Sequence, residues 1–116
     1  MGANALKFDT ASFTVSAGAE VTLKFANVST INQHNWVLVQ PGTKDAVAAA
    51  GVTVGPANGW VPAGDARVIA NTRLLDPGAD AEVRFTAPAA GTYQFVCASP
   101  GHNFTMFGDF VVTKAT

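Results

Sequence analysis

The stretch GTYQFVCASPGHNFTMFGDFVVTK, residues 91–114, predicts two β-strands joined by a loop over residues 98–106. Strand alternation places Tyr93, Phe95 and Cys97 on one face of the first strand. If the two strands pair in antiparallel fashion, Cys97 and Met106 lie at the same end of the sheet, with His102 in the loop between them. The stretch therefore gathers the single cysteine of the chain, one of its two histidines and one of its two methionines.

Short alternating segments recur along the rest of the chain. The most regular is EVTLKFANV, residues 20–28, in which Val21, Leu23 and Phe25 share one face. Further strands are predicted over residues 6–8, 12–15, 34–40, 81–87 and 107–114. Seven or eight short strands at this spacing, separated by turn residues, indicate an all-β Greek-key β-sandwich.

One segment departs from the strand pattern. TKDAVAAAG, residues 43–51, is rich in alanine and predicts a short helix, with Thr43 as N-cap and Gly51 as C-cap. RVIANTRLL, residues 67–75, fits a strand or a short helix, and we interpret it as extended. The expected architecture is thus one domain over residues 1–116, a sandwich of seven to eight strands with a single helical insertion.

Composition and charge argue against several classes of protein. The chain has 116 residues and a net charge of −1, and its few charges form no basic patch that would favour nucleic acid. No apolar run approaches the ~20 residues needed to cross a bilayer. The N-terminal residues lack the plan of a signal peptide, although a signal or membrane tether could have been removed from a longer precursor. A single cysteine excludes an internal disulfide.

The scarce side chains form a plausible ligand set if His34, at the start of another strand, reaches the same end of the sandwich. Strand order alone allows His34 to lie at either end. Two imidazoles, a thiolate and a thioether suit copper, whereas zinc rarely uses methionine and iron–sulfur clusters need more cysteines. Taken singly, Cys97 would more often be a buried core residue, Met106 core filler and His34 an ordinary strand-end residue.

The spacing Cys-x4-His-x3-Met at Cys97, His102 and Met106, with His34-Asn35-Trp36 upstream, resembles the cupredoxin family of blue copper proteins. Within that family, the loop length and the HNWVLV stretch are similar to azurins and, more closely, to the auracyanins of phototrophic bacteria. The two-residue gap between cysteine and histidine in plastocyanins does not fit. The chain also lacks the further cysteines that form the disulfide of azurins.

The resemblance implies one type 1 copper ion bound by His34, Cys97, His102 and Met106. It implies electron transfer rather than catalysis, outside the cytoplasm or in a periplasm, in a photosynthetic or respiratory chain. The implied partners are redox proteins, namely a quinol-oxidising complex and a cytochrome-bearing reaction centre. A monomer is the expected state, and a membrane tether outside this chain is compatible with the family.

The resemblance also suggests roles for residues around the ligands. The backbone N–H of Asn35 would donate to the thiolate, and its side chain would join the two ligand loops. Trp36 is expected in the core. The expected docking patch for partners consists of exposed apolar residues at the ligand pole, namely Ile31, Pro77, Pro100 and Phe104.

Three alternatives stay open at the level of sequence. Copper enzymes related to this fold need a second metal site with additional histidines, and this chain has only two histidines in total. A cysteine nucleophile with a histidine base would leave Met106 without a part. A copper-binding or purely structural sandwich that does not shuttle electrons is the main remaining alternative.

Overall fold

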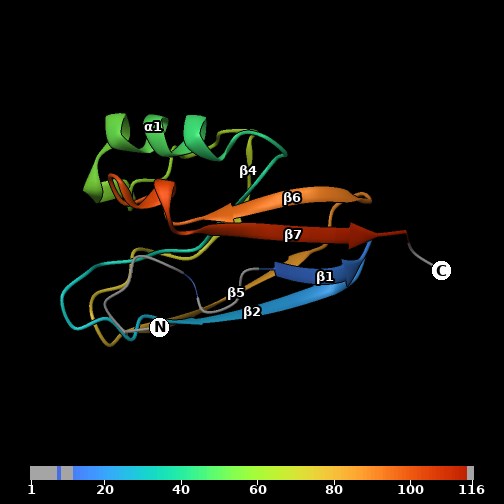
Figure 1. Ribbon diagram of the computed structural model, residues 1–116, viewed down its shortest axis with the longest axis horizontal. Coiled ribbons are helices and arrows are strands. Elements are labelled where there is room, and N and C mark those ends of the chain that lie inside the picture. Colours follow the sequence, from blue (N-terminus) through green and yellow to red (C-terminus); the bar gives the residue numbers. More distant parts are fainter. Residues whose placement is uncertain (1–7, 9–11, 115–116) are drawn as a thin grey trace.

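Two β-sheets form the protein, as seen in the computed structural model, which describes Phe8 and residues 12–114 (Figure 1). The larger sheet has the order β1-β7-β6-β3-β4, and the smaller one pairs β2 with β5. The strands are β1 Ser12–Ser16, β2 Glu20–Ala26, β3 Val37–Val39, β4 Val68–Asn71, β5 Asp80–Thr86, β6 Gly91–Val96 and β7 Phe107–Thr113. The helical segments are α1 Lys44–Val54 and the short 3₁₀ helices η1 Pro56–Asn58 and η2 His102–Phe104.

The main hydrophobic core lies between the two sheets. β2 and β5 pair in antiparallel register, with Leu23 opposite Val83, and their polar residues alternate with apolar residues that face the core. The larger sheet contributes Leu38 and Phe95, and Trp36 lies directly before β3; all three are almost completely buried. The predicted sandwich of seven to eight strands with one helical insertion is confirmed, with seven strands among the described residues. The strand predicted over residues 6–8 lies outside the described residues except for Phe8.

Helix α1 covers the other face of the larger sheet. Its Val47 packs with Val37 and Val39 of β3 and Val96 of β6 in a second apolar cluster. Figure 1 shows α1 above β6, with β2 and β5 on the opposite side of that strand. None of the helices among the described residues is long and apolar enough to span a membrane.

The predicted C-terminal end of the helix needs correction, whereas Thr43 does precede its first residue. α1 continues three residues past Gly51 to Val54, and its C-cap is Gly55, whose N–H donates to the carbonyl of Gly51. Gly51 therefore lies inside the helix. A glycine is needed there because the backbone of Trp60 passes so close that a Cβ on residue 51 would lie 1.8 Å from the carbonyl oxygen of Trp60. Thr43 is at the N-cap position, but its hydroxyl donates to the carbonyl of Gln40 at 2.6 Å instead of capping the helix.

β6 and β7 pair in antiparallel register, as predicted from residues 91–114. The pairing extends beyond the strands, because the N–H of Cys97 donates to the carbonyl of Met106 at 3.0 Å. The segment 67–75 is extended over β4, as interpreted from the sequence, and pairs with β3. Both ends of the loop 98–106 are thus fixed at the same edge of the core.

Candidate metal centre

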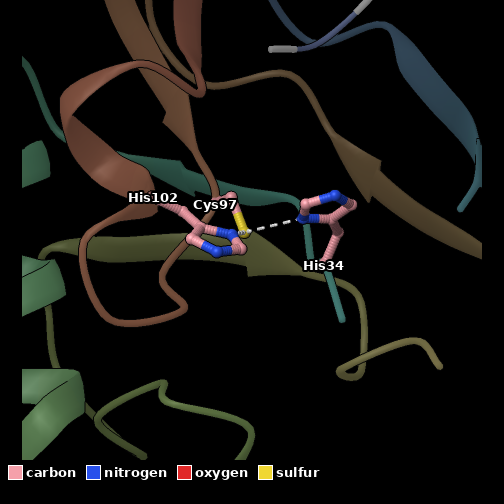
Figure 2. Close-up of side chains that lie close together, drawn as sticks. All are labelled: His34, Cys97 and His102. Carbon is pink, nitrogen blue, oxygen red and sulfur yellow. Dashed lines mark hydrogen bonds between the residues drawn. The ribbon is translucent and has the colours of Figure 1, made fainter. Parts of the chain in front are cut away.

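Three side chains with metal-binding atoms converge at one pole of the sandwich. One ligand atom from each of His34, Cys97 and His102 lies within 4.8 Å of the other two. The Cys97 sulfur is 3.8 Å from Nδ1 of His34 and 3.6 Å from Nδ1 of His102. Figure 2 shows the two imidazoles on either side of the sulfur. The sequence-predicted set of His34, Cys97 and His102 is therefore brought together.

A single β-bridge decides the position of His34, which strand order left open. The N–H of His34 donates to the carbonyl of Leu75 at 3.1 Å, and the N–H of Leu75 donates back to His34 at 2.8 Å. Leu75 is fully buried. The bridge therefore fixes the backbone of His34 against the core, at the pole that also carries Cys97 and His102.

Met106 lies next to this group through its backbone. Its N–H donates to the carbonyl of His102 at 2.7 Å, and its own carbonyl accepts from Cys97. The residue is only 2% exposed. The fourth predicted residue is thus held directly beside two of the other three, under the same protein surface.

Burial controls the protonation of the cluster. Burial, and to a smaller extent the neighbouring His102, lower the pKa of His34 to about 4. Burial also lowers the pKa of His102. Both imidazoles are therefore neutral near pH 7, which is the form that binds metals.

Burial also raises the pKa of the Cys97 thiol. Hydrogen bonds from the backbone N–H groups of Asn35 and Ser99, and from the Ser99 hydroxyl, oppose that rise. The same hydroxyl lies 3.3 Å from the carbonyl of Gln33, so this carbonyl and the sulfur compete for one proton. A thiolate at this site has hydrogen-bond donors, but it needs a cation to offset its burial.

The distances fit a small transition-metal ion. An ion at about 2.0 Å from nitrogen and about 2.3 Å from sulfur, with angles between tetrahedral and trigonal, separates those atoms by about 3.5 to 3.7 Å. The observed separations are 3.6 and 3.8 Å. The cluster contains no carboxylate, which disfavours magnesium and calcium, and a thiolate beside two imidazoles favours copper.

Asn35 joins the two ligand-bearing segments, as predicted. Its Oδ1 accepts from the N–H of Ala98 at 2.8 Å, and its Nδ2 donates to the carbonyl of Gly59 at 2.8 Å. Asn35 is completely buried. Trp36, predicted as a core residue, is 2% exposed.

Sequence reasoning missed a buried polar network that shapes the approach to His34. The side-chain amide of Asn27 donates to the carbonyls of Asn32 and Leu75, each at 2.9 Å, and its Oδ1 accepts from the N–H of Ser29. The Ser29 hydroxyl in turn accepts from the N–H of Asn32 at 2.9 Å. The signal was the Asn-Val-Ser order after β2, because asparagine and serine commonly bond to backbone groups in turns.

Comparison with known proteins gives consistent matches. Copper binding proteins of the plastocyanin/azurin family match residues 1–113. Auracyanin-A of Chloroflexus aurantiacus is 47% identical over 109 residues, which span 92% of this chain and 67% of that protein. Auracyanin-B of the same organism is 40% identical over 116 residues, which span 95% of this chain but only 48% of the length of auracyanin-B.

A solved structure is similar as well. The structure of auracyanin A, described as a blue copper protein from the green thermophilic photosynthetic bacterium Chloroflexus aurantiacus, superposes with a TM-score of 0.89. The two chains are 46% identical, and the alignment covers 94% of this chain and 90% of that one. The likeness thus extends over nearly the whole length of both chains.

Proposed function

Because this chain belongs to the plastocyanin/azurin family of copper-binding proteins, we propose that it is an electron carrier with one type 1 copper ion. His34, Cys97, His102 and Met106 would hold the ion. Copper would supply the redox couple, gaining one electron from a donor as Cu(II) and passing that electron on from Cu(I). The observation that supports this most directly is the buried sulfur with an imidazole Nδ1 at 3.6 Å on one side and another at 3.8 Å.

The role of the protein in such a reaction is to hold the ligands still. Electron transfer is fast when neither ligands nor solvent must rearrange between the two oxidation states. His34 is fixed by its β-bridge to Leu75, and the backbone N–H of Cys97 donates a hydrogen bond to the carbonyl of Met106. His34 and Cys97 are at most 4% exposed, so water has little access to the ligand atoms. The thiolate and the thioether are soft ligands that favour the reduced ion, so the reduction potential should be fairly high.

The face around His102 is proposed as the docking surface for redox partners. Of the two histidines His102 is the more exposed, which shortens the path to a partner. Ile31 and Phe104 are each 72% exposed, and Pro77 and Pro100 are exposed too. A small apolar patch without a strong charge suits the weak interfaces of transient redox complexes.

The physiological setting extends the same proposal. The partners would be a membrane quinol-oxidising complex as donor and a cytochrome or reaction centre as acceptor, outside the cytoplasmic membrane. The chain would act as a monomer, held near the membrane by a tether outside this sequence. Catalysis is disfavoured, because the cluster uses both histidines of the chain and leaves no imidazole for a second metal.

The first test is an optical spectrum after addition of Cu(II), recorded beside a Cys97→Ser variant. We expect an intense visible band that a reductant bleaches, that an oxidant restores and that the variant lacks. A band that forms but does not cycle would favour copper binding without electron shuttling. If no band forms and both proteins bind copper equally, the electron-carrier assignment is wrong.

A further inference from the structure

The first turn of helix α1 contacts the residue that follows each of two proposed ligands. Asn103 comes directly after His102, and its Nδ2 donates to Oδ1 of Asp45 at 2.8 Å. Nζ of Lys44 lies 3.3 Å from the carbonyl of the same Asn103. The ammonium group also sits 4.3 Å from the ring centroid of Phe107, which comes directly after Met106. Figure 1 shows α1 beside the loop that contains η2.

These contacts differ in strength. The ion pair between Lys44 and Asp45 is 2.8 Å long, but the Asp45 side chain is 63% exposed, so the pair adds little by itself. Asn103, by contrast, is only 6% exposed. A buried amide that loses its acceptor has no water to replace it, so the loss is unfavourable. The bond between Asn103 and Asp45 is therefore the main connection from the helix to the loop.

The same helix also contacts the segment that anchors the other ligand. Gly51 packs against the backbone of Trp60, which has a positive φ of 63°. The preceding residue, Gly59, offers its carbonyl to Nδ2 of Asn35, the neighbour of His34. One helix thus contacts both ligand-bearing segments, through Asn103 at its first turn and, near its end, through Trp60, the residue after Gly59.

We propose that α1 is a clamp for the metal centre, in which Asp45 and Asn103 are positioning residues for His102 and Met106. The proposal rests on the proposed function for the identity of the metal. The positioning role itself does not depend on the proposed function, because protein groups alone make the contacts. Loosening the clamp should loosen the loop even in protein that contains no metal.

The test uses four variants of the full chain. Asn103→Ala and Asp45→Ala each remove the bond, whereas Asp45→Asn keeps an acceptor oxygen at the same place. Thr53→Ala, at an exposed position in the last turn of the same helix, serves as the control. Asp45 is on the surface, so its variants should fold normally, and that is checked by far-ultraviolet circular dichroism.

The first readout is amide hydrogen exchange in metal-free protein. The N–H groups of Thr105 and Met106 both donate to the carbonyl of His102, so they report on the loop directly. We expect their exchange to accelerate about fivefold in Asp45→Ala and Asn103→Ala, as one lost hydrogen bond predicts. Asp45→Asn and Thr53→Ala should stay close to the wild type. Unchanged exchange in both alanine variants would overturn the clamp.

The second readout is the rate at which Cu(II) passes to a chelator. The two alanine variants should lose copper about fivefold faster than the wild type, and the double variant no faster than the single ones, because both remove the same bond. Equal rates in all proteins would contradict the proposal. If the wild type shows no thiolate–copper band, the proposed function fails, while the exchange experiment still decides on the clamp.

Discussion

The side chain of Asn35 holds the backbone of Ala98 through a 2.8 Å hydrogen bond, although the two residues are 63 positions apart in the sequence. Asn35 follows His34, and Ala98 follows Cys97. The bond therefore joins the neighbours of two proposed ligands, and both partners are completely buried. The second bond of the same side chain, to Gly59, extends the connection to the turn beneath helix α1.

Replacing Asn35 by alanine should destabilise the protein strongly. The change leaves the buried N–H of Ala98 and the half-buried carbonyl of Gly59 without this partner, and a buried polar group that loses its partner costs about 1 to 3 kcal/mol. We expect the free energy of unfolding of the metal-free protein to fall by about 3 kcal/mol in urea titrations. Asn71→Ala, at an exposed position, is the control and should change it by less than about 0.5 kcal/mol. Equal effects of the two changes would show that the connection is unimportant.

Replacing Gly51 by alanine should also destabilise the protein, against the usual preference of helices. Alanine in a helix interior is favoured over glycine by about 1 kcal/mol. At this position, however, the added Cβ would lie 1.8 Å from the carbonyl oxygen of Trp60, so the backbone has to move. Overpacking of this kind costs typically about 1 to 3 kcal/mol and should exceed the gain.

Thermal unfolding tests the Gly51 prediction. Gly51→Ala should melt several degrees below the wild type. Ala46→Gly, at an exposed position of the same helix, measures the ordinary effect of propensity. A rise in melting temperature for Gly51→Ala would show that the helix and the segment at Trp60 separate without penalty.

Ser99 should tune the reduction potential of the copper-loaded protein. Its hydroxyl lies within reach of both the thiolate and the carbonyl of Gln33. A hydrogen bond to the thiolate withdraws charge from the metal and favours the reduced ion. Removing about 1 kcal/mol of that interaction in Ser99→Ala should lower the potential by roughly 40 mV.

Voltammetry checks the prediction for Ser99. Ser99→Thr keeps the hydroxyl and should stay near the wild-type potential. The backbone N–H of residue 99 is present in all three proteins, so the comparison isolates the hydroxyl. An unchanged or higher potential in Ser99→Ala would mean that the hydroxyl serves the Gln33 carbonyl instead.

The parts of the fold that the sequence predicts are those governed by local pattern. Alternation in β2 correctly separates Leu23 from its polar neighbours, because a strand with one buried face repeats every two residues. The placing of Cys97 beside Met106 follows from one antiparallel turn of chain. The spacing of Cys97, His102 and Met106 then indicates the family, and the family resemblance implies that the bound metal is copper.

The parts that the sequence does not predict depend on distant partners. The pole occupied by His34 follows from its bridge to Leu75, and no local pattern encodes that pairing. Glycine often stops helices, so the local pattern places Gly51 at the helix end, whereas in the structure it lies inside the helix and makes room for the backbone of Trp60. Asp45 and Asn103 are 58 positions apart, and each alone is an ordinary polar residue.

The buried histidine should make the metal-free protein sensitive to mild acid. The pKa of His34 is about 4 in the folded chain against 6.5 for an ordinary histidine, mainly because burial disfavours the charged ring. Above pH 6.5 the ring is neutral in both states, and the full stability is present. As the pH falls from 6.5 towards 4, the unfolded chain binds the proton first, so stability is progressively lost.

Urea titrations of metal-free protein at pH 7 and pH 4.5 measure that loss. We expect a loss of about 2 kcal/mol attributable to His34, which is less than the full shift implies because pH 4.5 still lies above the pKa of His34 in the folded chain. His34→Gln removes the titrating ring, keeps hydrogen-bonding capacity and should lose less stability over the same interval. Carboxylates titrate equally in both proteins, so they cancel in the comparison. If the two proteins lose the same stability between these pH values, the ring of His34 is already accessible to protons in the folded chain.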